Sequence, residues 1–366
     1  MYVQIRARTS YILHCIFCTR NITYNFPILA QTIKFSNAST DFYFDSSLKE
    51  LGKIVDKRSA IVITDENIFK AHESKFKGFI TIVIPPGEDQ KNQSLVDGII
   101  GQLIDKKVDR KSVLIGVGGG VITDITGYTA SIYMRGIRFG FVPTTILALV
   151  DASIGGKNGI DVGLYKNMVG IIRQPSFLLH DLSLLQSLPE KEWQNGFAEI
   201  IKHACIKDAT LFKQLEQHSL ADYMKDKKLL AELIRRNALI KTKVVQKDEF
   251  EKGDRRLLNY GHTIGHAIET QYGLMHGEAV AIGMVYAGEI SEQLLGFDSK
   301  EQVKTLIKKY QLPTTVSFDA KKVFEVLAMD KKRVQKEMNF VLLNKIGKAV
   351  VHPIPLQRLE KIINKL

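Results

Sequence analysis

The sequence predicts an α/β N-terminal domain with a mainly parallel, Rossmann-like sheet, followed by an all-helical C-terminal domain. In residues 31–180, short and continuous apolar runs alternate with amphipathic helical segments. Such runs are typical of parallel strands that helices cover on both faces. In residues 181–366, long amphipathic stretches take over and strand patterns nearly vanish. With 366 residues and 45% hydrophobic content, the chain is long enough for two domains, and we expect a ligand cleft between them.

Each expected element rests on its own pattern. The segment SSLKELGKIVDK opens with serine caps and has helical periodicity, whereas AIVITDENI has the pattern of a buried strand. Strands are then expected in FITIVI, VLIGVGGG and RFGFVPTT, with helices NQSLVDGIIGQLIDKK and TDITGYTASIYM between them. The helical half is predicted from LPEKEWQNGFAEIIKHACI, LLAELIRRNALIKTKVVQKD and HGEAVAIGMVYAGEISEQLLG. The domain boundary is expected between Leu179 and Leu185.

Composition excludes several classes of protein. The formal charge of +12 suits anionic ligands, but the basic residues are spread along the chain and no basic-aromatic array indicates nucleic-acid binding. No apolar run reaches the ~18 residues of a membrane span. Only three cysteines occur, and the CxxC of Cys15 and Cys18 has no second pair, so a zinc or redox role is the less favoured interpretation. We expect a cytoplasmic protein in which residues 1–30 form an N-terminal extension, with its disorder an open question.

The stretch VLIGVGGGVITD, residues 113–124, indicates a phosphate-binding loop. Its glycines let backbone N–H groups and a helix N-terminus approach a pyrophosphate, although Val121 stands where a dinucleotide fingerprint would end in glycine. A tight turn with no ligand is the alternative. Neighbouring strands end at PPGEDQK and PTT, so a nucleotide site at this edge would include Glu88, Lys91, Thr144 and Thr145.

The glycine-rich segment DASIGGKNGIDVGLYKN, residues 151–167, has almost no secondary-structure pattern. A structureless stretch of this length in a compact domain is usually functional, so Lys157 and Lys166 are predicted to face phosphate groups. The alternative is a solvated loop that carries ordinary surface lysines.

Ionisable groups on the predicted helices indicate a divalent metal site. Glu199 and Lys202 share a helix face, which a surface ion pair would also explain. His262 and His266 are one helical turn apart with Gly261 and Gly265 beside them, and His276 follows with Gly277 directly after it. Three histidines with a glutamate favour zinc or a similar ion, although HxxxH alone is often structural. Spacing leaves open which three of these four groups are ligands, and bare geometry favours His262 with His266.

Together, these motifs resemble the 3-dehydroquinate synthase family and, more broadly, the sugar-phosphate cyclases. The matching pieces extend in order from about residue 35 to residue 350: PPGEDQK, GGGVITD, YMRG, VPTTILALVDASIGGKNGID, KNMVG, GFAEIIKHA, RRLLNYGHTIGHAIE, HGEAVAIGM and MDKK. Thr123 departs from the glycine that many relatives have there. The resemblance implies the dehydroquinate synthase-like fold, usually as a homodimer.

The resemblance also implies cofactors, a substrate and site residues. It implies catalytic NAD, a divalent metal, zinc or cobalt, and the sugar phosphate 3-deoxy-D-arabino-heptulosonate 7-phosphate as substrate. The metal ligands would be Glu199, His262 and His276, which leaves His266 for the substrate phosphate and replaces the choice made from spacing. NAD contacts would be Glu88, Lys91, Gly119, Gly120, Asp124, Thr144, Thr145 and Asp151, with Lys157 and Lys166 nearby. Catalytic residues would be Arg135, Lys157, Glu251 and His266, and substrate-binding residues Asn167, Lys202, Lys241, Arg255, Asn259 and one of Lys331 or Lys332.

In the implied reaction, hydride passes from a substrate carbon to NAD, phosphate is eliminated, the hydride returns, and an intramolecular aldol step closes the ring. His266 or the leaving phosphate would take the proton during elimination, with Glu251 and Arg135 in support. The alternatives are another sugar-phosphate cyclase, a metal-dependent polyol or glycerol-phosphate dehydrogenase that consumes NAD, and a scaffold protein without activity. Lys241 and Arg255 favour a substrate with a carboxylate.

Overall fold

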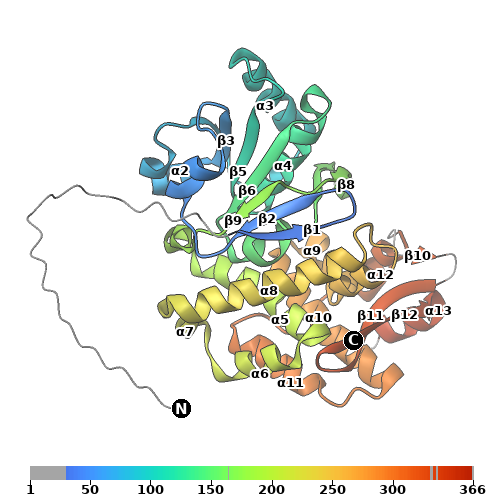
Figure 1. The fold of residues 1–366 in the computed structure, drawn as a ribbon. Coiled ribbons are helices and arrows are strands. Elements are labelled where there is room, and N and C mark those ends of the chain that lie inside the picture. Colours follow the sequence, from blue (N-terminus) through green and yellow to red (C-terminus); the bar gives the residue numbers. More distant parts are fainter. Residues whose placement is uncertain (1–29, 164, 330–332, 335–336, 365–366) are drawn as a thin grey trace, which may run out of the picture.

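The structure is a computed structural model that describes residues 30–163, 165–329, 333–334 and 337–364 (Figure 1). The predicted N-terminal extension, except for its last residue, and both candidate lysines of the MDKK motif lie outside these residues. Figure 1 shows the sheet of the N-terminal half on one side of the molecule and the helices of the C-terminal half on the other.

A seven-stranded sheet organises the N-terminal half, with the strand order β1-β2-β9-β6-β5-β3-β4. Its strands are β1 (Gln31–Lys34), β2 (Ser39–Tyr43), β3 (Ala60–Asp65), β4 (Ile80–Ile84), β5 (Val113–Gly118), β6 (Arg138–Pro143) and β9 (Phe177–Leu179). All neighbouring pairs are parallel except β1 with β2, which confirms the mainly parallel sheet. From β3 the chain continues to β4 on one side and then to β5 on the other. The strand order therefore reverses at β3 and β5, where α/β sheets bind ligands.

Helices cover this sheet because their apolar residues recur on one face. In α3 (Gln93–Asp105), Val96, Ile99 and Leu103 are buried, and the side chain of Asn92 caps the helix by accepting from the Leu95 N–H. The other helices of this half are α1 (Leu51–Ile54), α2 (Glu66–His72) and α4 (Gly120–Ile132).

The segment predicted to be a structureless loop has regular structure. It begins in a π-helix, Ala148–Ala152, and continues as an antiparallel hairpin of β7 (Lys157–Val162) and β8 (Tyr165–Ile172). Every residue of β8 is exposed. Because neither face of this strand is buried, its sequence has no alternation of apolar and polar residues that would have predicted a strand. The glycines allow the backbones to approach closely, since a Cβ on Gly170 would lie 2.4 Å from the Asn158 carbonyl oxygen.

The C-terminal half is mainly helical, as predicted, and its helices pack around a second apolar core. They are α5 (Glu190–Lys207), α6 (Ala209–Gln217), α7 (Leu220–Lys225), α8 (Lys227–Lys247), α9 (His262–Tyr272), α10 (His276–Leu295), α11 (Lys300–Lys309), α12 (Ala320–Met329) and α13 (Leu356–Ile363). None of the helices in the described ranges is long and apolar enough to cross a membrane.

The prediction that this half is all-helical needs one correction. It also contains an antiparallel sheet of β10 (Arg333–Val334), β11 (Glu337–Lys345) and β12 (Lys348–Pro355). In β11, Phe340 and Leu342 enter one apolar cluster while Val341 and Leu343 enter another. Because both faces of β11 are buried, its sequence is a short continuous apolar run, which periodicity cannot distinguish from a buried helix.

Candidate active site

The glycine-rich loop joins β5 to α4 at the edge of the sheet where its order reverses. Gly118 ends β5, Gly119 is the N-cap of α4, and Gly120 is its first residue. A Cβ on Gly118 would lie 2.4 Å from Ile122 Cγ1, so the turn requires glycine there. Beside the loop, the buried Thr144 hydroxyl makes no hydrogen bond within the described part of the chain. An open helix N-terminus with a free hydroxyl nearby fits a phosphate-bearing cofactor.

Lys91 connects this loop to the hairpin. Its side chain is buried, and its Nζ lies 2.7 Å from Asp124 Oδ2 and 3.8 Å from Glu88 Oε1. It also donates a 2.6 Å hydrogen bond to Asn167 Oδ1. Burial lowers the pKa of Lys91, but the charges of Asp124 and Glu88 outweigh this effect, so the pKa is raised above its usual value. A buried cation is therefore held among residues predicted to contact the cofactor.

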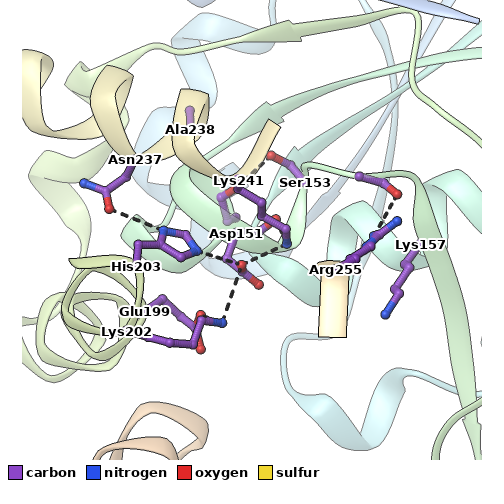
Figure 2. A network of polar contacts seen from close by, with 12 residues as sticks. Asp151, Ser153, Lys157, Glu199, Lys202, His203, Asn237, Ala238, Lys241 and Arg255 are labelled. Carbon is purple, nitrogen blue, oxygen red and sulfur yellow. Dashed lines mark hydrogen bonds and ion pairs between the residues drawn. The ribbon is translucent and has the colours of Figure 1, made fainter. Parts of the chain in front are cut away.

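Asp151 is the centre of a polar network between the two halves of the chain (Figure 2). Its Oδ1 lies 2.8 Å from Lys241 Nζ on α8 and 3.9 Å from Lys202 Nζ on α5. His203 Nε2 lies 3.6 Å away, and its Nδ1 is 3.3 Å from Asn237 Oδ1. Burial raises the pKa of Asp151, but the charges of Lys241 and Lys202 outweigh this effect and hold the pKa well below its usual range. Burial lowers the pKa of Lys241 to about 8, against the opposing effect of Asp151.

A second group of predicted substrate residues lies between the hairpin and the segment after α8. Lys157 forms an ion pair with Glu251, whose Oε1 accepts a 2.8 Å hydrogen bond from Asn259 Nδ2. Arg255 is buried, and its Nη2 donates to the Gly155 carbonyl at 2.9 Å. These contacts bring two cations and a carboxylate from two distant segments of the chain to one place, and such an arrangement suits an anionic ligand.

The predicted metal ligands also come together. Ligand atoms of Glu199, His262 and His276 lie within 4.8 Å of one another. Glu199 is fully buried, and its Oε1 is 3.5 Å from His262 Nε2 and 3.4 Å from His276 Nε2. Its other oxygen, Oε2, forms an ion pair with Lys202. One carboxylate and two imidazoles form a donor set that suits zinc or cobalt.

His266 falls in a different group, with Glu269 and His276, so the geometry does not combine His262 and His266 as spacing alone had favoured. The His262 and His266 rings meet edge to face, with centroids 5.1 Å apart. The Nε2 of His262 is the nitrogen near Glu199, while its Nδ1 is 3.1 Å from the Tyr260 carbonyl. The i,i+4 spacing therefore brings the two rings together, although the two histidines fall in different groups of potential metal ligands.

Three glycines allow the helices with the histidines to pack closely. A Cβ on Gly283 of α10 would lie 1.9 Å from the Gly261 carbonyl oxygen, and one on Gly265 would lie 2.9 Å from the Ala279 carbonyl oxygen. Gly261 itself has φ +78 and directly precedes His262. The spacing of His262 and His276 therefore depends on backbone contact between α9 and α10.

Three predicted site residues, and Met134 next to one of them, have left-handed backbone conformations. They are Met134 (φ 49), Arg135 (φ 65), Asn167 (φ 55) and Glu251 (φ 58). Asparagine tolerates this region well, but Arg135 and Glu251 are strained there. Strained backbone is often found at functional sites, although Asp45, Lys107 and Gln311 also have positive φ and are not predicted site residues.

The structure does not bring every predicted residue into these clusters. Arg135 is exposed after α4, and no hydrogen bond or ion pair of the described chain joins it to another predicted site residue. Lys166 lies 2.5 Å from Glu269 Oε1, on the side of the metal cluster. Neither Glu269 nor His203 was among the predicted site residues. Glu269 is seven residues after His262, so the two lie on one face of α9, but this spacing alone does not distinguish a buried carboxylate from a surface one.

Comparison with known proteins gives the family. Residues 81–195 match the 3-dehydroquinate synthase N-terminal family, and residues 196–333 match the 3-dehydroquinate synthase C-terminal family. A protein of Thermodesulfovibrio yellowstonii named 3-dehydroquinate synthase is 40% identical over 326 residues, which cover 87% of this chain and 90% of that protein. A protein of the same name from Prochlorococcus marinus is 45% identical over 283 residues, 75% of this chain and 77% of its own.

Solved structures agree with this fold. The 2-epi-5-epi-valiolone synthase of Streptomyces hygroscopicus with NAD+ and Zn2+ bound has a TM-score of 0.82 and 26% identity, over 92% of this chain and 98% of its own. A 2-deoxy-scyllo-inosose synthase complexed with carbaglucose-6-phosphate, NAD+ and Co2+ has a TM-score of 0.81 and 25% identity, over 92% of this chain and 100% of its own. On these similarities, the chain belongs to the 3-dehydroquinate synthase family.

Proposed function

We propose that this protein is an NAD- and metal-dependent lyase that converts 3-deoxy-D-arabino-heptulosonate 7-phosphate to 3-dehydroquinate and phosphate. The observation that carries the proposal is the position of Lys202. This buried lysine contacts Glu199 of the metal cluster and Asp151 at the boundary with the cofactor loop. One substrate would therefore meet the metal cluster and the cofactor at the same place.

The residues fit both groups that the relatives contain. The open N-terminus of α4 and the Thr144 hydroxyl suit the phosphates of NAD, and the donor set of Glu199, His262 and His276 suits zinc or cobalt. When bound, the ion would acidify a substrate hydroxyl and NAD would accept and return a hydride. Asp124 and Lys91 would fix the cofactor edge of the site, since they form a buried ion pair.

The remaining residues would bind the substrate and transfer its protons. Lys241 and Arg255 would bind the carboxylate, because both are buried cations near Asp151 and Gly155. Glu251, which contacts Lys157 and Asn259, and His266 would exchange protons with the substrate, with the departing phosphate as a further acceptor. Burial of Lys202 and Glu199 would exclude water from the reacting centre. Arg135, Asn167 and one of Lys331 or Lys332 complete the proposed substrate set.

The assay that tests the function combines the purified protein with the heptulosonate phosphate, NAD and zinc. We expect phosphate and 3-dehydroquinate in equal amounts, with no accumulation of NADH, because the hydride returns within each turnover. Stoichiometric NADH would instead support a polyol dehydrogenase, the second candidate. Phosphate release without dehydroquinate would contradict the proposal.

Substrate affinity is expected to fall as pH rises above about 8, the pKa of Lys241. Burial lowers this pKa, and Lys202 and Arg255 lower it further, while Asp151 opposes them. The ammonium is present below the pKa and is lost above it, so KM should rise about tenfold per pH unit once the neutral amine dominates. Steady-state kinetics from pH 7 to 9.5 measure this change. Lys241→Arg should show no such rise in KM, and an unchanged wild-type KM at pH 9.5 would refute the assignment.

Two further properties belong to the proposal. A homodimer is supported by the family resemblance, and light scattering after size exclusion should give twice the chain mass. A cytoplasmic location is supported by the low cysteine content, since Cys205 is buried with a free thiol. The division into residues 31–180 and 181–366 is supported by the end of β9 at Leu179 and the start of α5 at Glu190.

A further inference from the structure

We propose that Glu269 is a positioning residue that fixes the His276 ring so that its Nε2 faces the metal, with Lys166 holding Glu269 in place. The inference rests on the proposed metal site. It concerns a carboxylate on α9 and a lysine on the hairpin strand β8 that meet beside the first residue of α10. Glu269 would act through His276 and would not touch the substrate.

The two nitrogens of His276 face two different carboxylates. Its Nε2 lies 3.4 Å from Glu199 Oε1, inside the metal cluster. Its Nδ1 lies 3.2 Å from Glu269 Oε2, on the opposite side of the ring. An imidazole that binds a metal through Nε2 carries its proton on Nδ1, and an acceptor for that proton fixes both the tautomer and the ring orientation. Glu269 supplies this acceptor.

The other imidazole of the cluster has an equivalent partner. His262 Nδ1 is 3.1 Å from the Tyr260 carbonyl oxygen, so the backbone orients this ring. The side chain of His276 is 29% exposed, compared with 10% for His262. His276 is also the first residue of α10 and follows Met275, which has an extended backbone. Packing therefore restrains His276 less than His262, and more of its orientation depends on a hydrogen bond.

Lys166 restrains the carboxylate of Glu269. Its Nζ lies 2.5 Å from Oε1, so one carboxylate oxygen is paired with lysine and the other with His276. Glu269 is only 6% exposed, and the lysine neutralises a charge that would be costly to bury alone. The ion pair also disfavours direct metal binding by Glu269, although ligand atoms of His266, Glu269 and His276 lie within 4.8 Å of one another.

The experiment measures metal binding to the full-length protein, with Glu269→Gln, Glu269→Ala and Lys166→Met as variants. Zinc affinity is obtained by competition with a chromophoric chelator, and stoichiometry by elemental analysis. Glu269→Ala should weaken zinc binding about 10- to 100-fold while stoichiometry at saturation stays at the wild-type value, because second partners of metal-binding histidines have effects of this size. Glu269→Gln should recover part of the affinity, since its amide oxygen still accepts from Nδ1–H. Lys166→Met should lose less than Glu269→Ala.

A matched control separates positioning from general stability. Asp181 is a carboxylate of similar burial, with 3% of its surface exposed. Its Oδ2 lies 2.9 Å from Lys75 Nζ, and it belongs to none of the groups that could hold a metal in the described chain. Asp181→Asn should lower Tm and leave zinc affinity within twofold of wild type. The Co2+ absorption spectrum provides a second readout, because a reoriented His276 changes the ligand field. Glu269→Ala should shift this spectrum, whereas Asp181→Asn should not.

Three results would overturn the inference. An unchanged zinc affinity and Co2+ spectrum in Glu269→Ala would show that Glu269 does not position His276. A lower zinc stoichiometry at saturation would make Glu269 a ligand. An equal loss of zinc affinity in Glu269→Gln and Glu269→Ala would refute the role of the accepting oxygen. If the alanine variant does not fold, the zinc affinity and Co2+ spectrum of Glu269→Gln provide the test. If the wild-type protein binds no zinc or cobalt, the proposed metal site itself is wrong. This outcome differs from failure of the inference, in which the wild-type protein binds metal and the Glu269 variants bind it equally well.

Discussion

His276→Ala is expected to lose stoichiometric zinc and to reduce turnover about a thousandfold. The substitution removes one of two imidazoles that converge with Glu199, and two protein ligands would remain. A catalytic metal contributes several kcal/mol of transition-state stabilisation, and about 4 kcal/mol corresponds to a factor of about a thousand. Elemental analysis after gel filtration measures the zinc, and coupled detection of phosphate measures turnover.

His352→Ala is the matched control for this substitution. His352 lies half-buried on β12 and belongs to none of the potential metal-binding groups among the described residues. It should retain zinc and activity within about twofold, because the substitution removes an imidazole that belongs to none of these groups. Full zinc content in His276→Ala would mean that the ligand set is wrong, even if activity were lost.

Gly283→Ala is expected to destabilise the protein by about 3 kcal/mol or more and to weaken metal binding as well. The new Cβ would lie 1.9 Å from the Gly261 carbonyl oxygen, and backbone cannot move aside as a flexible side chain can. Overpacking a tight core usually costs about 1–3 kcal/mol, and a contact with backbone belongs at or above the upper end. Because His262 follows Gly261, separation of α9 from α10 would also move a proposed metal ligand. Urea unfolding and zinc competition measure the two effects.

Gly288→Ala tests the same residue change on the same helix. A Cβ there would be 3.5 Å from the nearest atom, Lys300 Cβ, which is an ordinary contact. Alanine is favoured over glycine within a helix by about 0.5–1 kcal/mol, so this variant should be as stable as wild type or slightly more stable. Similar losses in both variants would refute the argument from close packing.

Local pattern was sufficient to predict the strands β3, β4, β5 and β6 of the sheet but not every element. Strands β3 and β5 are buried on both faces and lie between helices of recognisable periodicity, so their apolar runs identify them. The same kind of run in β11 has no such context, and the exposed β8 has no apolar alternation. A sequence window contains only local information, whereas these strands are defined by the layers that pack on them.

The candidate site shows a similar division. The histidine spacing indicated a metal, but the third group is contributed by Glu199 on α5, far along the chain. Helical spacing can relate residues on one helix only, so the choice of Glu199 over His266 came from the family resemblance. Glu269 was missed because a glutamate on a helix is ordinarily a solvated surface residue, and its burial becomes visible only in the folded chain.

The left-handed backbone at Arg135 and Glu251 has a consequence for selection and engineering. Each strained residue costs about 1–3 kcal/mol, a large share of the 5–15 kcal/mol by which a typical domain is stable. Glycine would adopt these φ values freely, but it would remove the guanidinium or the carboxylate. A search for heat-resistant variants that ignored turnover would therefore favour glycine at both positions. Under the proposed catalytic roles of Arg135 and Glu251, such variants would be more stable but slower, and stability and catalytic rate would place opposing demands on the same two residues.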